Sequence, residues 1–219
     1  MRSTIIITTV LVLMTACGQR PKSHDTPEVI LAQMRSDTCW IRELDSLAQV
    51  AIGPGAKCID PVWHTFSYDG RTWFFNQDWG GVLEIPSDFI PEDDSWQAEL
   101  SFHGTRAWSP DSLILISFYA GFQALRNEEV QESALLGLID YGFVVQSIEE
   151  KDGALTVHAR NAEGVNYYGR YIFANADGIE YSVSIQYPDE KIHAITHILE
   201  MINRFPAGPN NHVYKGMAL

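Results

Sequence analysis

Alternating apolar and polar positions along the second half of the chain predict β-strands. Four segments alternate or are rich in branched and aromatic residues, and short turns that contain glycine join them. These expected strands cover residues 143–149, 154–160, 166–173 and 179–188. Four apolar segments upstream predict further strands at residues 71–76, 80–86, 97–104 and 113–120. Strands that meet through short turns pair antiparallel, so the pattern predicts a large antiparallel sheet.

Helical spacing of apolar residues marks three other regions. Residues 26–52 fit either one interrupted helix or two short helices. Residues 127–140 predict a helix that Gly142 closes, and an amphipathic helix is expected from about Asp189 to Asn203. The fold class that follows is α+β, with a large antiparallel β-sheet flanked by α-helices.

The first sixteen residues have the pattern of a secretory signal. Arg2 precedes an apolar run from Ile5 to Met14, and small residues follow. Ten helical residues would cover only about 15 Å, roughly half of the hydrocarbon thickness of a bilayer. The run is therefore too short for a comfortable permanent membrane span.

The residues after the apolar run, Met14-Thr15-Ala16-Cys17, resemble the lipobox of bacterial lipoproteins. That resemblance implies cleavage before Cys17 and attachment of lipid to the Cys17 sulfur, although Met14 stands where the lipobox usually has leucine. Two or three acyl chains anchor a protein stably, whereas one binds only marginally. The expected location is the bacterial cell envelope. The outer membrane is favoured because Gly18 replaces the aspartate that retains some lipoproteins in the inner membrane.

The expected organisation is a signal peptide (1–16), a tether (17–25), a helical N-terminal extension (26–60), an α+β domain (61–205) and a flexible tail (206–219). The formal net charge is −13, and loss of Arg2 with the signal makes it −14. An acidic chain of this kind argues against nucleic acid, because phosphates require clusters of Lys and Arg. It also argues against a body that lies electrostatically on anionic lipid.

Two cysteines remain once Cys17 is assigned to lipid. Cys39 and Cys58 could form a disulfide, which exported proteins favour, or could stay as two separate thiols. A helix from Cys39 to about Ile52 would cover roughly 20 Å, and six residues span that distance only when nearly extended. Both alternatives therefore stay open.

The order of several motifs resembles a known family. The motifs are GGVLEIPSDFIP, SPDSLILISFY, YGFVVQSIEEKDGALTVHAR, YYGRYIF and YSVSIQYPDEKIHAITHILEMINRF. They resemble bacterial envelope proteins with the fold of PsbP, the extrinsic protein of photosystem II, over roughly residues 68–205. Ser112 stands where the family usually has a turn glycine. The resemblance implies helices about an antiparallel sheet, implies no catalytic residue, and points to assembly or stabilising factors.

We find no pattern of catalytic or metal-binding residues. His193 and His197 are four residues apart, but the expected helix places them on its wet side and no HExxH motif is present. GxSxG and CxxC motifs are also absent. We therefore expect no catalytic residue, no metal site and no cofactor.

Aromatic residues are concentrated in the segment 63–79, and Trp96 and Trp108 follow further along the chain. Aromatics with a polar atom commonly form contact surfaces, but alternate members of such a run more often fill the core. The candidate contact residues are Trp73, Trp79 and Trp96.

The leading hypothesis is a lipid-anchored, non-catalytic binding or assembly factor for an envelope protein partner. The alternative is a binding module for a small molecule or glycan that uses exposed aromatics. A hydrolase or metalloprotein is a third and weaker hypothesis, because no nucleophile, base and orienting group can be assembled.

Overall fold

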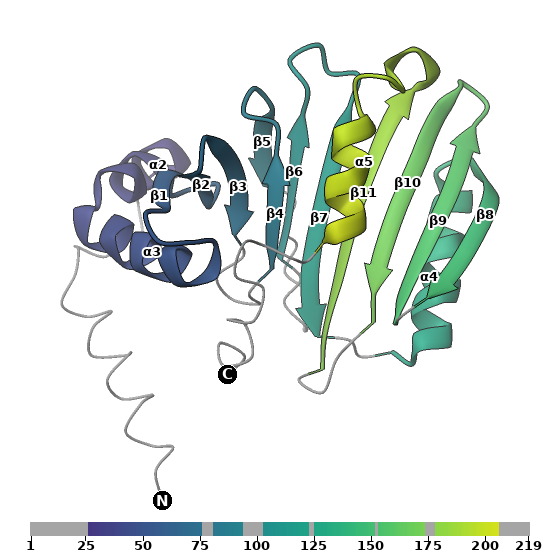
Figure 1. Cartoon of the computed structure of the whole chain (residues 1–219), viewed down its shortest axis with the longest axis horizontal. Helices are drawn as coiled ribbons and strands as arrows, with labels where there is room; N and C mark the ends of the chain where they lie inside the picture. The colour runs from purple at the N-terminus through teal and green to yellow at the C-terminus, as the bar shows by residue number, and fades with distance from the viewer. Residues whose placement is uncertain are drawn as a thin grey trace, which may run out of the picture.

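The structure is a computed structural model that describes residues 26–75, 81–93, 103–122, 125–151, 153–173 and 178–205. Two antiparallel sheets, one of four strands and one of seven, make up its framework (Figure 1). The expected signal peptide, Cys17, the tether, the C-terminal tail, Trp79 and Trp96 all lie outside the described residues.

Two helices and the four-stranded sheet form the N-terminal part. The helices are α2 (Pro27–Ser36) and α3 (Thr38–Ala51), and the strands follow in the order β1 (Lys57–Asp60), β2 (Thr65–Tyr68), β3 (Arg71–Phe75) and β4 (Val82–Ile85). Asp37 separates the helices, since its carboxylate accepts the backbone N–H groups of Cys39 and Trp40 at 2.9 and 3.0 Å. Of the two alternatives for residues 26–52, two short helices are therefore correct.

Helix α3 covers one face of this sheet. Leu44, Ala48 and Ala51 repeat at helical spacing and are fully buried against Phe66 and Phe75. Strand β1 pairs with β2, with Cys58 opposite Phe66. The boundary expected after residue 60 therefore falls between two hydrogen-bonded strands, and the helical extension shares a core with the sheet that follows it.

The seven-stranded sheet has the order β5-β6-β7-β11-β10-β9-β8, with every neighbouring pair antiparallel. Its strands are β5 (Ile90–Asp93), β6 (His103–Trp108), β7 (Leu115–Phe122), β8 (Phe143–Lys151), β9 (Ala154–Asn161), β10 (Val165–Ile172) and β11 (Ile179–Pro188). The last four were predicted closely. Strand β11 buries every second residue, as its alternating sequence indicates.

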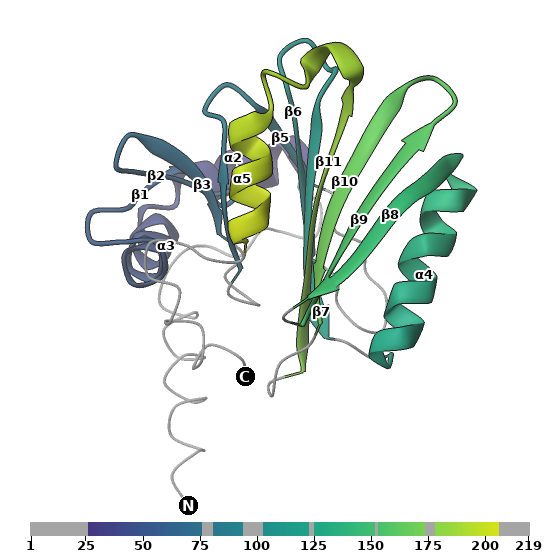
Figure 2. The same ribbon diagram turned by 45° about the vertical axis from the view of Figure 1, so that its right-hand side comes forward.

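Helices α4 (Asn127–Asp140) and α5 (Thr196–Arg204) lie on opposite faces of the large sheet, with α5 between the two sheets (Figure 2). The main core forms around α5 and includes Phe118, Ile185 and Ile198. Full burial of a large aliphatic side chain contributes roughly 1.5–3 kcal/mol. The α+β fold class with a large antiparallel sheet flanked by helices is thus confirmed.

The C-terminal helix is shorter than expected. A 3₁₀ turn, η1 (Asp189–Lys191), follows β11, and α5 begins only at Thr196. His193 therefore precedes α5 while His197 lies within it, and both are exposed. The helical i, i+4 arrangement expected for the two imidazoles is wrong, because the chain between them is not helical.

The turn between β6 and β7 is held by its own side chains. Ser109 Oγ donates to Asp111 at 2.6 Å and accepts the Ile114 N–H at 2.9 Å. Ser112 has a φ of 57°, in the left-handed region that a residue with a Cβ adopts only at a cost. Ser112 thus occupies a position that suits glycine.

We predict that Ser112→Gly stabilises the protein. Relief of the left-handed strain, about 1–2 kcal/mol, exceeds the extra entropy that glycine gives the unfolded chain, so the expected gain is about 0.5–1 kcal/mol. Urea unfolding measures it. Ser112→Ala is the control, because it removes the hydroxyl and keeps the Cβ; an equal gain from alanine would contradict the backbone explanation.

Candidate functional site

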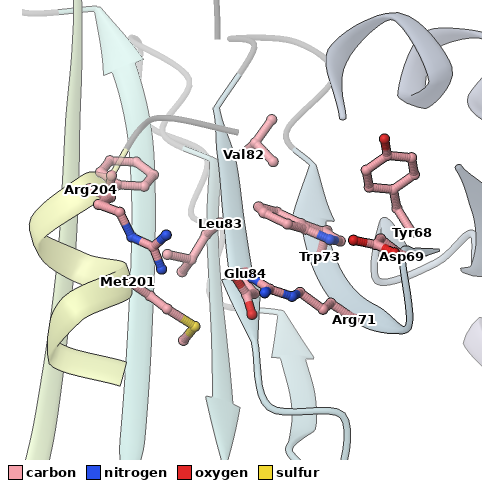
Figure 3. Close-up of a pocket in the computed structure, with 10 residues that line it drawn as sticks. Tyr68, Asp69, Arg71, Trp73, Val82, Leu83, Glu84, Met201 and Arg204 are labelled. Atoms are coloured by element: carbon pink, nitrogen blue, oxygen red, sulfur yellow. Dashed lines mark hydrogen bonds and ion pairs between the residues drawn. The ribbon is translucent and has the colours of Figure 1, made fainter. Parts of the chain in front are cut away.

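A cleft of about 480 Å³ opens between the small sheet and the C-terminal end of α5. Its walls come from the β2–β3 turn, from β3 and β4, and from α5 and the residue after it (Figure 3). The lining residues are Tyr68, Asp69, Arg71, Trp73, Val82, Leu83, Glu84, Met201, Arg204 and Phe205. The cleft therefore joins residues that are more than a hundred positions apart in the sequence.

One of the two arginines in the cleft is already neutralised. Arg71 Nη1 lies 3.0 Å from Glu84 Oε2, and the Arg71 side chain is half-exposed. An exposed pair of this kind contributes little to stability, typically about 0–1 kcal/mol. Its main effect on the site is that the charges of Arg71 and Glu84 cancel.

Arg204 is the basic residue of the cleft that is not paired with an acid. It is exposed at the end of α5, and its Nε donates to the Glu200 carbonyl at 3.3 Å. The terminal guanidinium nitrogens have no partner among the described residues. A guanidinium presents planar paired donors that match carboxylate and phosphate oxygens.

Trp73 lines the cleft without presenting an exposed ring face to it. The side chain is only 6% exposed, because it packs into the core of α3 and the small sheet. Its Nε1 is buried and has no hydrogen-bond partner among the described residues. A buried donor without a partner costs about 1–3 kcal/mol. Trp73 therefore cannot serve as an exposed aromatic platform, although it lies at the wall of the cleft as Figure 3 shows.

Several aromatic residues of the segment 63–79 lie in the core. Phe66, Phe74 and Phe75 are at most 2% exposed, so these rings pack inside as the core interpretation expects. Burial is not restricted to alternate members, because Phe74 packs in the core around α5 and Phe75 in the core under α3. Trp79 and Trp96, the other two candidate contact residues, lie outside the described residues and stay predictions.

Cys58 carries a free thiol in the structure, so the candidate Cys39–Cys58 disulfide is not formed. The Cys58 N–H donates to Asp45 Oδ1 at 2.6 Å, which ties this strand to the middle of α3. Cys39 lies in the first turn of the same helix, six residues before Asp45 and about 9 Å from it along the helix axis. Burial, together with Asp45 and Asp60, raises the pKa of the Cys58 thiol to about 12.

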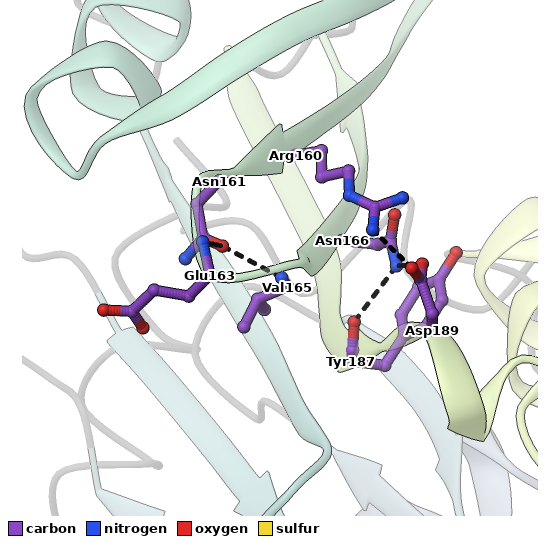
Figure 4. A network of polar contacts seen from close by, with 7 residues as sticks. All are labelled: Arg160, Asn161, Glu163, Val165, Asn166, Tyr187 and Asp189. Carbon is purple, nitrogen blue, oxygen red and sulfur yellow. Dashed lines mark hydrogen bonds and ion pairs between the residues drawn. The ribbon is translucent and has the colours of Figure 1, made fainter.

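A polar network fixes the chain that leads into α5 (Figure 4). Asn166 Nδ2 donates to Asp189 Oδ1 at 2.8 Å, and Arg160 pairs with the other Asp189 oxygen. The hydrogen bond from Asn166 lowers the pKa of Asp189 most, and the contact with Arg160 lowers it further. Lys191 binds Asp111 in the β6–β7 turn at 2.5 Å. The start of η1 is thereby held to two neighbouring turns, and α5 with Arg204 follows from this fixed point.

A second cavity, of about 440 Å³, lies on the other face of the large sheet, next to α4. Glu180 on β11 lines it, and Glu180 Oε2 is buried without a partner among the described residues. Burial raises the pKa of Glu180 from its ordinary value of 4.5 to about 7. Neither Glu180 nor Arg204 was predicted as a site residue. A lone acid in an alternating strand was the only sequence signal for Glu180.

Among the described residues, no three His, Cys, Asp or Glu side chains gather in a way that could hold a metal ion. Within the same part of the chain, none of the helices combines the length and the apolar composition that a bilayer crossing requires.

No protein-family model matches the sequence, and no curated protein sequence matches it either. Among solved structures, the chain is similar to the solution structure of cyanobacterial PsbP from Synechocystis sp. PCC 6803, with 8% identity and a TM-score of 0.46. That likeness covers 63% of this chain and 91% of the other. A likeness at this level says nothing about ligand or activity.

We predict that Glu180→Gln raises the thermal midpoint at pH 8 more than at pH 5. The folded-state pKa lies above the ordinary value, so the cost of burying the charge is absent below about pH 4.5 and grows as pH rises to about 7. Glutamine removes the charge at every pH. Glu150→Gln, an exposed position on β8, is the control. Equal gains at both pH values, or equal gains from both variants, would contradict the assignment.

Proposed function

We propose that this chain is a lipid-anchored protein of the bacterial envelope that binds a small organic anion in the cleft beside α5 and catalyses no reaction. The observation that carries this proposal concerns Arg204. Its guanidinium projects from α5 at the cleft, and the terminal nitrogens have no partner among the described residues (Figure 3). A non-catalytic binding role is common to both binding hypotheses from the sequence, of which the leading one names a protein partner and the alternative a small molecule or glycan. The small ligand is preferred over a protein partner because a defined cleft is present.

The size and the lining of the cleft support a small ligand. Pockets for small molecules commonly enclose about 300–1,000 Å³, and this one encloses about 480 Å³. Leu83, Met201 and Phe205 offer apolar contact beside Arg204. A ligand with an acidic group and a compact apolar body matches both features.

The charges of the four ionised lining residues sum to zero, so the preference for an anion rests on the unpaired donors of Arg204 and not on the net charge of the cleft. With Arg71 and Glu84 paired, Arg204 and Asp69 are the charged residues that remain among the lining residues. A ligand oxygen near Trp73 would in addition satisfy an indole N–H that now lacks a partner. A neutral glycan would need an open ring face, which buried Trp73 does not present.

The anchor rests on the sequence. Arg2, the short apolar run and the Met14-Thr15-Ala16-Cys17 motif together resemble a lipoprotein signal. Lipid on Cys17 would hold the protein at a membrane while its acidic body stays in the aqueous phase. In this proposal the protein faces the periplasm or the exterior from the outer membrane.

We predict that the full chain binds phenylacetate and that Arg204→Gln weakens this binding about tenfold or more. Loss of a charge-assisted hydrogen bond costs about 1.5–3 kcal/mol, and 1.4 kcal/mol is tenfold in affinity. Titration calorimetry measures the affinity, and 2-phenylethanol tests the need for the acidic group. Arg42→Gln, an exposed change on α3, should leave the affinity unaltered. Equal binding of acid and alcohol, or full affinity in Arg204→Gln, would disprove this site.

We predict that Cys17→Ser moves the protein from the membrane fraction to the soluble fraction and abolishes incorporation of labelled palmitate. The reason is that no other residue in the signal region can carry the lipid. Cys58→Ser should keep both the label and the membrane association. The anchoring proposal would be overturned if the wild-type protein incorporated no palmitate, or if the Cys17→Ser variant still sedimented with membranes.

A further inference from the structure

The cavity next to α4 is separate from the cleft. Its floor is formed by β7, β11 and β10, and the N-terminal half of α4 forms one wall through Val130, Ser133 and Ala134. Helices α4 and α5 cover opposite faces of the large sheet (Figure 2). A ligand in this cavity would therefore share no lining residue with a ligand in the cleft.

The strand register places two tyrosines on either side of β11. Ser182 lies opposite Tyr119 of β7 and also opposite Tyr171 of β10, so the three residues form one row across the sheet. All three line the cavity. Phe173, directly after β10, adds a third aromatic ring to the lining.

Glu180 lies two residues before Ser182, on the same face of β11. Its neighbour on β7 is Gly121, which has no side chain to cover it. The Glu180 side chain makes no hydrogen bond or ion pair within the described residues, and its Oε2 is shielded from solvent. A desolvated carboxylate without a partner is costly, and a cation or an N–H donor would relieve that cost.

We propose that this cavity binds an organic ammonium ion, with Glu180 as its counter-ion and the rings of Tyr119, Tyr171 and Phe173 around its carbon atoms. An ammonium group supplies the N–H donors that Glu180 lacks. Aromatic rings attract cations through the negative potential of their faces. Glu180 is the only charged residue among the described residues that line the cavity.

The surroundings also favour a cation over an anion. Helix α4 carries Glu128, Glu129 and Glu132 in its N-terminal half, on the element that forms the wall. Of these acids, Glu129 pairs with Arg126 at 2.9 Å. An anion would meet the negative charge of Glu180 directly and would gain no basic partner from the lining.

Binding should tighten as pH rises through about 7. The groups on the same face as Glu180 are Tyr119 of β7, Tyr171 of β10 and Ser182 of β11, and α4 contributes Ser133. Tyr181 also borders the cavity, but its ring packs against Phe205 on the opposite face of the sheet. Burial keeps the pKa of Tyr171 well above 10, so it stays neutral near pH 7. Glu180, with a pKa of about 7, is the group that changes charge in this range. Between pH 6 and pH 8 its ionised fraction rises about tenfold.

The test is calorimetric titration of the full chain with benzylammonium at pH 6 and pH 8. Benzyl alcohol serves as the probe of matching shape without charge. We expect benzylammonium to bind saturably and about tenfold more tightly at pH 8, and we expect the alcohol to bind at least tenfold more weakly than benzylammonium. Absence of binding, or equal binding of amine and alcohol, overturns the proposal.

Two variants sharpen the result. Glu180→Gln removes the charge in a nearly equal volume and should weaken benzylammonium binding at least tenfold and abolish its pH dependence. Glu150→Gln makes the same chemical change at an exposed position and should do neither. Thermal melts at pH 8 verify that both variants fold. Undiminished binding in folded Glu180→Gln overturns the site, and unchanged benzylammonium affinity in Arg204→Gln separates this proposal from the phenylacetate site.

Discussion

Strand β11 lies between β7 and β10, and its register with both neighbours decides which side chains face each layer of the protein. Val183 and Ile185 point into the main core with α5, whereas Glu180, Ser182 and Ser184 belong to the opposite face. A shift by one residue would bury the polar set and expose the apolar set. Strand β11 therefore presents apolar side chains to the core around α5 and polar side chains, Glu180 and Ser182, to the cavity next to α4.

The cleft depends on how firmly α5 is placed. Ile195, Ile198 and Ile202 are at most 2% exposed, so burial of apolar surface holds the helix between the sheets. Apolar contacts alone allow a helix to slide, but Asp189 and Lys191 tie its leading segment to two turns through directional polar contacts. Packing thus supplies most of the free energy, and the polar network fixes the position from which Arg204 faces β4.

The long strands could be predicted from the sequence because their alternation extends over eight or more residues. The short strands β1, β2 and β5 were missed, since four residues such as those of β1 carry too few apolar positions to show a period. The terminal helix was placed too early because Ile192 continues the helical spacing, yet in the structure it is 41% exposed and precedes α5. The cleft could not be predicted, since it requires the tertiary contact that brings Arg204 to β3 and β4.

Net charge alone does not decide what an acidic protein of this kind binds. The formal charge of −13 repels anions at long range, but at physiological ionic strength such fields decay over about 8 Å. Within that distance the partners of each ionisable group matter more than the total. Arg204 has terminal nitrogens without a partner and Glu180 has a carboxylate without one, on opposite faces of the sheet. The same acidic chain can therefore present one site suited to an anion and another suited to a cation.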